Sequence, residues 1–272
     1  METETRRVDL ELAVQDVDGV RTAAAVGAAR VELCAALGAT GGITPSMGAV
    51  GLAVETGLPV HVLIRPRPGS FVYSPEELAV AEADTQSALR VGAAGVVIGA
   101  LTDGGTIDRA AVERLVGTAR DIAPDAEITF HRAIDTALHA GHEPAALLEQ
   151  LAGPSVTRIL TSGGSNDWGL GLPVLRTLVA ASARLGSPLQ IMAGGGVRLG
   201  VIPALLDAGA DAIHVSAKHH VNPSGVSAAP GQGRPDHEAT ALGLAASIAR
   251  ALPLEAPAPG TLTRLPGAPP TV

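Results

Sequence analysis

The sequence predicts an α/β protein built as a single (β/α)8 TIM barrel, and three observations favour that fold. Short apolar runs rich in Val, Ile and Leu alternate with segments of helical spacing over roughly 215 residues, and a barrel needs a chain of about this size. One helix-to-strand pattern recurs, because residues 27–34 resemble residues 209–216 and residues 92–99. No Gly-x-Gly-x-x-Gly follows the first expected strand, which disfavours the alternative, a doubly wound open sheet.

Eight strands are expected, each short and most of them rich in β-branched residues. They cover residues 8–14, 30–34, 60–65, 95–99, 127–131, 157–161, 189–193 and 212–216. Helices are expected between them, with the clearest starts at Ser74, which precedes Pro75 and Glu77, and at Asp108. Glycines at 27, 92 and 209 stand where helices are expected to end in a left-handed residue.

The domain boundaries follow from changes in composition along the chain. Residues 1–220 are expected to form the barrel, and residues 221–251 a loop and a final helix that packs on it. The loop, 221–236, is rich in Gly, Pro and Ser and is a candidate lid; the helix is expected at 238–251. Residues 252–272 are dominated by Pro, Ala and Gly and are expected to be a disordered tail.

Composition and charge exclude several classes of function. The 272 residues are 46% hydrophobic and only 1% aromatic, with a net charge of -8 and one lysine, so nucleic-acid binding is not expected. A single cysteine rules out an internal disulfide bond. Four of the first seven residues are charged and no apolar stretch could cross a bilayer, so we expect no membrane association and a cytoplasmic protein.

Polar residues at alternate strand positions are expected to face the inside of the barrel. Successive strand side chains point to opposite faces, so apolar residues that pack under helices leave their polar neighbours facing inward. Active sites of these barrels lie at the carboxyl ends of the strands. The inward or mouth-facing residues expected there are Glu11, Glu32, Cys34, Arg65, His131, Arg132, Asp135, His214 and Ser216. A structural ion-pair network is the alternative, but burying this many charges is costly unless a ligand needs them.

A glycine-rich turn follows the seventh expected strand. Gly194, Gly195 and Gly196 let backbone N–H groups approach an anion, and the loops after strands seven and eight bind phosphate in many barrels. Thr161 and Ser162, after strand six, are candidates for further donors. A tight turn also requires glycine, so an anion site and a purely structural turn both stay open.

The motifs of the chain resemble those of the CutC family, which is named for copper homeostasis. The resemblance covers roughly residues 8–220. It rests on residues 30–36, 41–46, 59–67, 71–74, 129–135, 159–163, 191–198 and 206–209. It implies a (β/α)8 barrel and cytosolic copper handling, with cysteine thiolates as Cu(I) ligands. Cys34 would be the metal ligand here, completed by Met192, His214 or Cys34 of the partner subunit in a homo-oligomer.

Two functions therefore stay open, and with them whether the protein is an enzyme. One is a CutC-like homeostasis protein that binds copper as Cu(I). The other is an isomerase, epimerase or lyase that moves a proton on a small anionic or sugar-like metabolite. In that case Glu11 or Glu32 is the base, His131 the acid and Asp135 an orienting group. Arg65 and Arg132 would hold the anion, with His214 close to the carboxylates.

Overall fold

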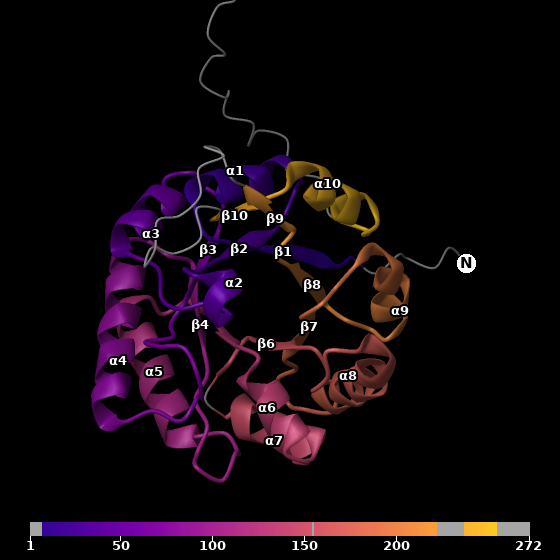
Figure 1. Cartoon of the computed structure of the whole chain (residues 1–272). Helices are drawn as coiled ribbons and strands as arrows, with labels where there is room; N and C mark the ends of the chain where they lie inside the picture. The colour runs from indigo at the N-terminus through magenta and orange to yellow at the C-terminus, as the bar shows by residue number, and fades with distance from the viewer. Residues whose placement is uncertain (1–6, 154, 222–236, 255–272) are drawn as a thin grey trace, which may run out of the picture.

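The computed structural model describes residues 7–153, 155–221 and 237–254, and its centre is a closed barrel of eight parallel strands (Figure 1). Each strand pairs with its neighbours in sequence, and β1 closes the ring against β8. The strands are β1 (Asp9–Val14), β2 (Arg30–Leu33), β3 (Val60–Leu63), β4 (Gly95–Ile98), β5 (Glu127–Phe130), β6 (Arg158–Thr161), β7 (Gln190–Gly194) and β8 (Ala212–Val215). The (β/α)8 prediction is confirmed, and the strand positions agree within two residues.

Helices surround the barrel on the outside, except the short helix after β2, which lies inside the ring of helices in this view (Figure 1). They are α1 (Val17–Ala25), α2 (Leu37–Thr40), α3 (Met47–Val54), α4 (Pro75–Arg90), α5 (Arg109–Ile122), α6 (Ala133–His139), α7 (Pro144–Ala152), α8 (Trp168–Ser182), α9 (Ile202–Asp207, after a 3-10 turn, Leu199–Val201) and α10 (Leu242–Arg250). Ser74 forms the expected capping box with Glu77, and Asp108 caps α5. None of the helices in the described ranges is long and apolar enough to cross a membrane.

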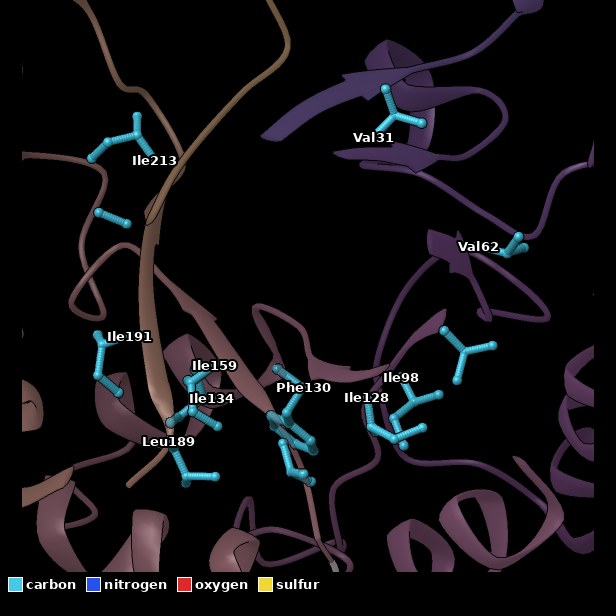
Figure 2. Close-up of a cluster of buried hydrophobic side chains, with 14 of the residues drawn as sticks. Val31, Val62, Ile98, Ile128, Phe130, Ile134, Ile159, Leu189, Ile191 and Ile213 are labelled. Atoms are coloured by element: carbon cyan, nitrogen blue, oxygen red, sulfur yellow. The ribbon is translucent and has the colours of Figure 1, made fainter. Parts of the chain in front are cut away.

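The main hydrophobic core lies between the barrel and its ring of helices. Figure 2 shows strand residues such as Val31, Ile128 and Ile213 pointing outward from the ring into this layer. All three are fully buried. Burying each such side chain contributes about 1.5–3 kcal/mol to stability. This burial in the outer layer decides which strand residues point outward. The alternate residues must then face the barrel interior, which confirms the alternation predicted for β2, β5 and β8.

The recurring helix-to-strand pattern has a backbone cause. Gly27, Gly92 and Gly209 have φ values of 76°, 105° and 87°, a region that glycine enters without steric cost. Each residue ends a helix and turns the chain into the next strand, which confirms the expected left-handed endings.

The C-terminal part differs from the predicted loop and helix. A two-stranded sheet, β9 (Lys218–Val221) with β10 (His237–Thr240), precedes α10, so the helix begins at Leu242 rather than at residue 238. The candidate lid at 222–236 lies outside the described residues, as does the expected tail from 255 onward. Leu252 is buried, and the carbonyl of Pro253 accepts a hydrogen bond from the N–H of Val8, so the start of that tail is packed against β1.

Charged residues fill the amino-terminal end of the barrel interior, here called the barrel floor (Asp9, Glu11, Arg30, Glu127 and Arg158). Arg30 donates to Glu11 at 2.7 Å and to Asp9 at 2.9 Å. Arg158 donates to Glu127 at 2.6 Å, and also to Gln190 and Thr129. These ion pairs fill the barrel interior at the amino-terminal ends of the strands. A ligand can therefore enter only at the carboxyl-terminal end.

Candidate active site

A cavity of about 650 Å³ opens at the carboxyl ends of the strands, and we call it the mouth cavity. Its volume falls in the range of small-molecule sites. The charged and polar side chains that line it are Glu32, Arg65, His131, Arg132, Arg198, His214, Ser216 and Lys218. Four of these are cationic and one is a carboxyl group. Arg132 is paired with Asp135 and Lys218 with Glu238, whereas Arg65 and Arg198 pair with no carboxylate among the described residues. In a protein whose net charge is -8, these two unpaired positive charges favour an anionic ligand.

His214, Glu11 and Glu32 form a connected group on β8, β1 and β2. Nδ1 of His214 lies 2.8 Å from Oε1 of Glu11, and the other oxygen of Glu11 accepts from Arg30. Burial opposes ionisation of Glu11, but the hydrogen bond from His214 and the charge on Arg30 hold the pKa of this carboxyl well below its usual value. The hydrogen bond to Glu11 and the two carboxylates raise the pKa of His214 although burial opposes the shift. Glu11 is therefore a buried anion with both oxygens in use.

Glu32 differs from Glu11 in its surroundings. It is 5% exposed, and its Oε2 is buried with no hydrogen-bond partner. Burial raises its pKa to about 7, and the negative charge on Glu11 adds to the shift. The carboxyl group therefore changes protonation near neutral pH, and one of its oxygens is available to a ligand.

His131 stands at the end of β5, directly before α6. Its ring centroid lies 4.8 Å from that of Phe71, and its Nδ1 accepts a hydrogen bond from the N–H of Ala133 at 3.1 Å. Burial, and then the positive charge of Arg65, lower the pKa of this histidine to about 3. The imidazole is therefore neutral at physiological pH.

Asp135 positions Arg132 and does not contact His131. Its carboxylate accepts from Nε of Arg132 at 2.8 Å, from the hydroxyls of Thr161 and Ser162, and from the N–H groups of Ser162 and Gly164. The hydroxyl of Ser162 in turn accepts from Arg132 at 3.0 Å. Thr161 and Ser162 do not line the cavity, so they support Arg132 rather than reach a ligand themselves.

Arg65 fastens two loops at the rim of the mouth cavity. Its Nη1 donates to the carbonyls of Thr40 and Gly42, and its Nη2 to the carbonyl of Gly69. The guanidinium also lies over the ring of Phe71, 5.0 Å from its centroid. No carboxylate among the described residues pairs with Arg65, so its charge stays available to the cavity.

The glycine-rich turn after β7 forms another wall of the cavity. A Cβ on Gly195, whose φ is 91°, would lie 2.8 Å from Cζ of Arg132, so only glycine allows this approach. The backbone N–H groups of residues 195–198 donate to no acceptor in the described part of the chain. Gly195, Gly196 and Arg198 line the cavity, whereas Gly194 lies deeper, where a Cβ would meet His214 and Leu160.

Cys34 lies apart from the other candidate metal ligands. The thiol is fully buried with Leu63 and Val97, and its Sγ is 3.6 Å from the carbonyl oxygen of Val14. Burial raises the pKa of this thiol, so it stays protonated. Met192 belongs to a separate apolar cluster, and its sulfur accepts from Arg30. The structure does not bring the expected pair of Cys34 and Met192 together.

The residues present fit a hard or borderline cation better than Cu(I). Within the described ranges, donor atoms of Glu11, Glu32 and His214 lie within 4.8 Å of one another. Two carboxylates and an imidazole suit a divalent ion, whereas Cu(I) prefers soft sulfur ligands in their ionised form. Cys34 is not in this group, and its combination with His214 stays a prediction.

Sequence reasoning missed several residues that shape the site. Arg30 and Arg158 face inward but were not named, although Arg30 is two residues before Glu32 and has the same parity. Gly99 lies in one of the three recurring segments but gave no signal of a role in the site, yet a Cβ there would lie 2.3 Å from the ring of His131. Phe71, which stacks on His131, comes from a loop, where strand parity gives no signal.

Comparison with known sequences identifies close relatives. Residues 8–219 match the CutC family. A CutC family protein of Yersinia enterocolitica is 41% identical over 209 residues, which are 76% of this chain and 78% of the relative. A CutC family protein of Vibrio vulnificus is 40% identical over 211 residues, or 77% of this chain and 80% of the relative.

Solved structures of the same architecture also match. The Streptococcus agalactiae CutC, described as a copper homeostasis protein, is 30% identical with a TM-score of 0.68, over 77% of this chain and 98% of that chain. Deoxyribose phosphate aldolase from Aeropyrum pernix is 21% identical with a TM-score of 0.56, over 78% and 86% of the two chains. At that identity the second match supports the barrel fold alone.

Proposed function

The chain belongs to the CutC family, and from this premise we propose that its mouth cavity is the active site of an enzyme that moves a proton on a small anionic metabolite. Isomerases, epimerases and lyases share this chemistry. The observation that carries the proposal is Glu32, a buried carboxyl group with a free oxygen and a pKa of about 7 in a positively charged cavity. A general base works best when its pKa lies near the working pH.

Glu32 rather than Glu11 is the base in this proposal. Both oxygens of Glu11 are already engaged, one by Arg30 and one by His214, and its pKa is held low. A carboxylate of that kind is a weak base. Glu11 instead keeps His214 oriented and favours its charged form, so His214 can return a proton to the substrate.

Arg132 and the turn at residues 195–198 bind the anionic group of the substrate. Asp135 and Ser162 fix the direction of the guanidinium, and Gly195 packs directly against it. The unpaired N–H groups of the turn add donors without a charge of their own. Arg65 and Arg198 add positive charge at the same cavity.

The test is exchange of substrate C–H protons with solvent deuterium, followed by NMR over a panel of sugar phosphates and keto acids. We expect exchange with the wild-type protein on at least one compound and its loss in Glu32→Gln. Glu127→Gln is the matched control, because Glu127 lies at the barrel floor and pairs with Arg158. Exchange that persists in Glu32→Gln, or no exchange on any compound, contradicts the proposal.

Copper binding is the second candidate, and the observation that favours it is the description of the Streptococcus agalactiae relative as a copper homeostasis protein. In this chain the only thiol is Cys34, which is buried and protonated. An anaerobic Cu(I) titration against a competing chelator, with wild type and Cys34→Ser, tests it. Tight binding that requires the thiol supports a cytoplasmic copper protein. Binding that instead requires Glu32 points to the carboxylate–imidazole group.

A further inference from the structure

His131 has a fixed tautomer that leaves one donor without a partner. A backbone N–H can only donate, so the hydrogen bond from Ala133 places the lone pair of the neutral imidazole on Nδ1. The ring proton is then on Nε2. That nitrogen is buried and has no acceptor among the described residues. A buried donor without an acceptor costs free energy, and His131 lines the mouth cavity, where a ligand could supply the acceptor.

The surroundings of His131 keep the ring neutral and prevent it from turning away. The ring of Phe71 lies on one side, tilted by 46°, and Gly99, directly after β4, leaves room for the imidazole because a Cβ there would lie 2.3 Å from Cε1. Arg65, which lies over Phe71, supplies a nearby positive charge. Burial and this charge lower the pKa of His131 to about 3, so it cannot serve as an imidazolium acid.

We infer that Nε2–H of His131 donates a hydrogen bond to a carbonyl oxygen of the substrate, so that the site takes an anionic aldehyde, ketone or keto acid. This inference rests on the proposed function and specifies its substrate class. Glu32 removes a proton from the carbon next to the carbonyl, and the C–H electron pair becomes the C=C bond of an enolate. The C=O π pair moves onto oxygen, where the donor of His131 stabilises the developing charge. A neutral imidazole in this role is a known solution to enolate chemistry.

The enolate then has three outcomes that balance in atoms and electrons. If the α-carbon carries a hydroxyl, the proton of this hydroxyl passes to the former carbonyl oxygen, a new C=O forms at the α-carbon, and His214 or protonated Glu32 protonates the old carbonyl carbon to give an isomer. Protonation of the α-carbon from the opposite face by His214 gives an epimer. In a lyase, the enolate oxygen re-forms the C=O, the C=C shifts to the β-carbon, and the leaving group departs with its bonding electron pair and takes a proton from His214. His131 keeps its proton in each case, because it only donates a hydrogen bond.

The experiment compares matched ligands that differ in one oxygen. Dihydroxyacetone phosphate and glycerol 3-phosphate share the anion but only the first has a carbonyl, and pyruvate and lactate form the second pair. We expect the wild type to bind one carbonyl compound at least about tenfold more tightly than its alcohol. His131→Phe, which keeps the stacked ring but has no donor, should lose this preference and retain binding of the alcohol. Deuterium exchange should fall by about 100-fold or more in the same variant.

A second measurement does not need a ligand. Nitrogen-15 shifts of the histidine rings, assigned with His131→Phe, should show a neutral Nε2–H form of His131 from pH 5 to pH 8. A ring that titrates in this range, or that carries its proton on Nδ1, overturns the inference. Equal affinity for carbonyl and alcohol, or a preference that survives in His131→Phe, also overturns it, even if Glu32-dependent exchange is intact. If no compound binds and none exchanges protons, both the proposed function and the carbonyl substrate class are contradicted.

Discussion

The barrel floor and the mouth cavity both contain buried charges, but only the floor satisfies them within the protein. At the floor each arginine donates to two or three side chains, and each carboxylate accepts from an arginine. His61, which lies next to Glu127, has a buried Nδ1 with no partner among the described residues, but burial lowers the pKa of its ring to about 4, so the ring carries no charge. At the mouth, Glu32 and His131 keep polar atoms with no partner. Paired charges hold the barrel together, and unpaired ones indicate where a ligand binds.

The largest expected effect is loss of a floor partner. Arg30→Met leaves the fully buried Glu11 without its arginine partner, and breaking such a buried pair costs about 3–5 kcal/mol. Arg132→Met is the matched change at the mouth, where the arginine side chain is 41% exposed, and should cost less than about 1 kcal/mol. Urea unfolding at pH 7.5 measures both. Equal losses would erase the distinction between the two ends of the barrel.

The second prediction is a gain in stability at the mouth that depends on pH. The pKa of Glu32 is raised to about 7 in the folded protein, so the folded state resists ionisation that the unfolded chain undergoes from pH 4.5 upward. Stability linked to this group is present below pH 4.5 and is lost as pH rises through 7. Relative to wild type, Glu32→Gln should therefore raise the free energy of unfolding more at pH 8 than at pH 5. The difference between the two pH values should be up to about 3 kcal/mol.

Glu127→Gln at the floor is the control for that prediction. Arg158 holds the pKa of Glu127 below its usual value, so the stabilising charge is present throughout pH 5 to 8 and is lost only in acid. This variant should lose the same stability at pH 5 and pH 8. A pH-independent effect of Glu32→Gln would show that the Glu32 carboxyl is paired in solution.

The smallest effect is expected at Cys34, which belongs to neither set of charges. Cys34→Ala removes one sulfur from a buried cluster and should cost about 1 kcal/mol, with no change in ligand binding at the mouth. The raised pKa of the thiol should slow its alkylation in the folded protein by at least about 100-fold relative to the unfolded chain. Rapid alkylation of the folded protein would place the thiol within reach of a ligand.

The fold was predictable because its determinants are local. Alternating apolar runs, the capping residues Ser74 and Asp108, and glycines at 27, 92 and 209 all act within a few residues of the features they specify. The alternation of side chains along each strand also predicted that Glu32 and His214 face inward, because the core outside the barrel decides which face each residue takes. The β9–β10 hairpin was missed, since Lys218–Val221 is exposed and lacks the apolar signal of a buried strand.

Partnerships across the barrel were beyond the reach of sequence patterns. Parity places Glu11 and Glu32 on the same inner surface but does not tell that Arg30 and His214 occupy one carboxylate and leave the other free. Asp135 was expected to orient His131 or Arg132, and the structure shows it bonded to Arg132. The pairing of His214 with Glu11 joins residues 203 positions apart in the chain, and only the closure of the ring between β8 and β1 brings them together.

Arg65 joins two loops through one side chain, and this has a consequence for how a ligand enters. Its bonds to the carbonyls of Thr40 and Gly42 must break before the first loop can swing outward, and its bond to the carbonyl of Gly69 before the second loop can. Arg65 therefore holds both loops at one flank of the mouth, and the backbone amides around it should exchange with solvent only when these bonds open. A ligand must approach along the remaining sides, so the direction of entry is set by a residue that contacts no other charge.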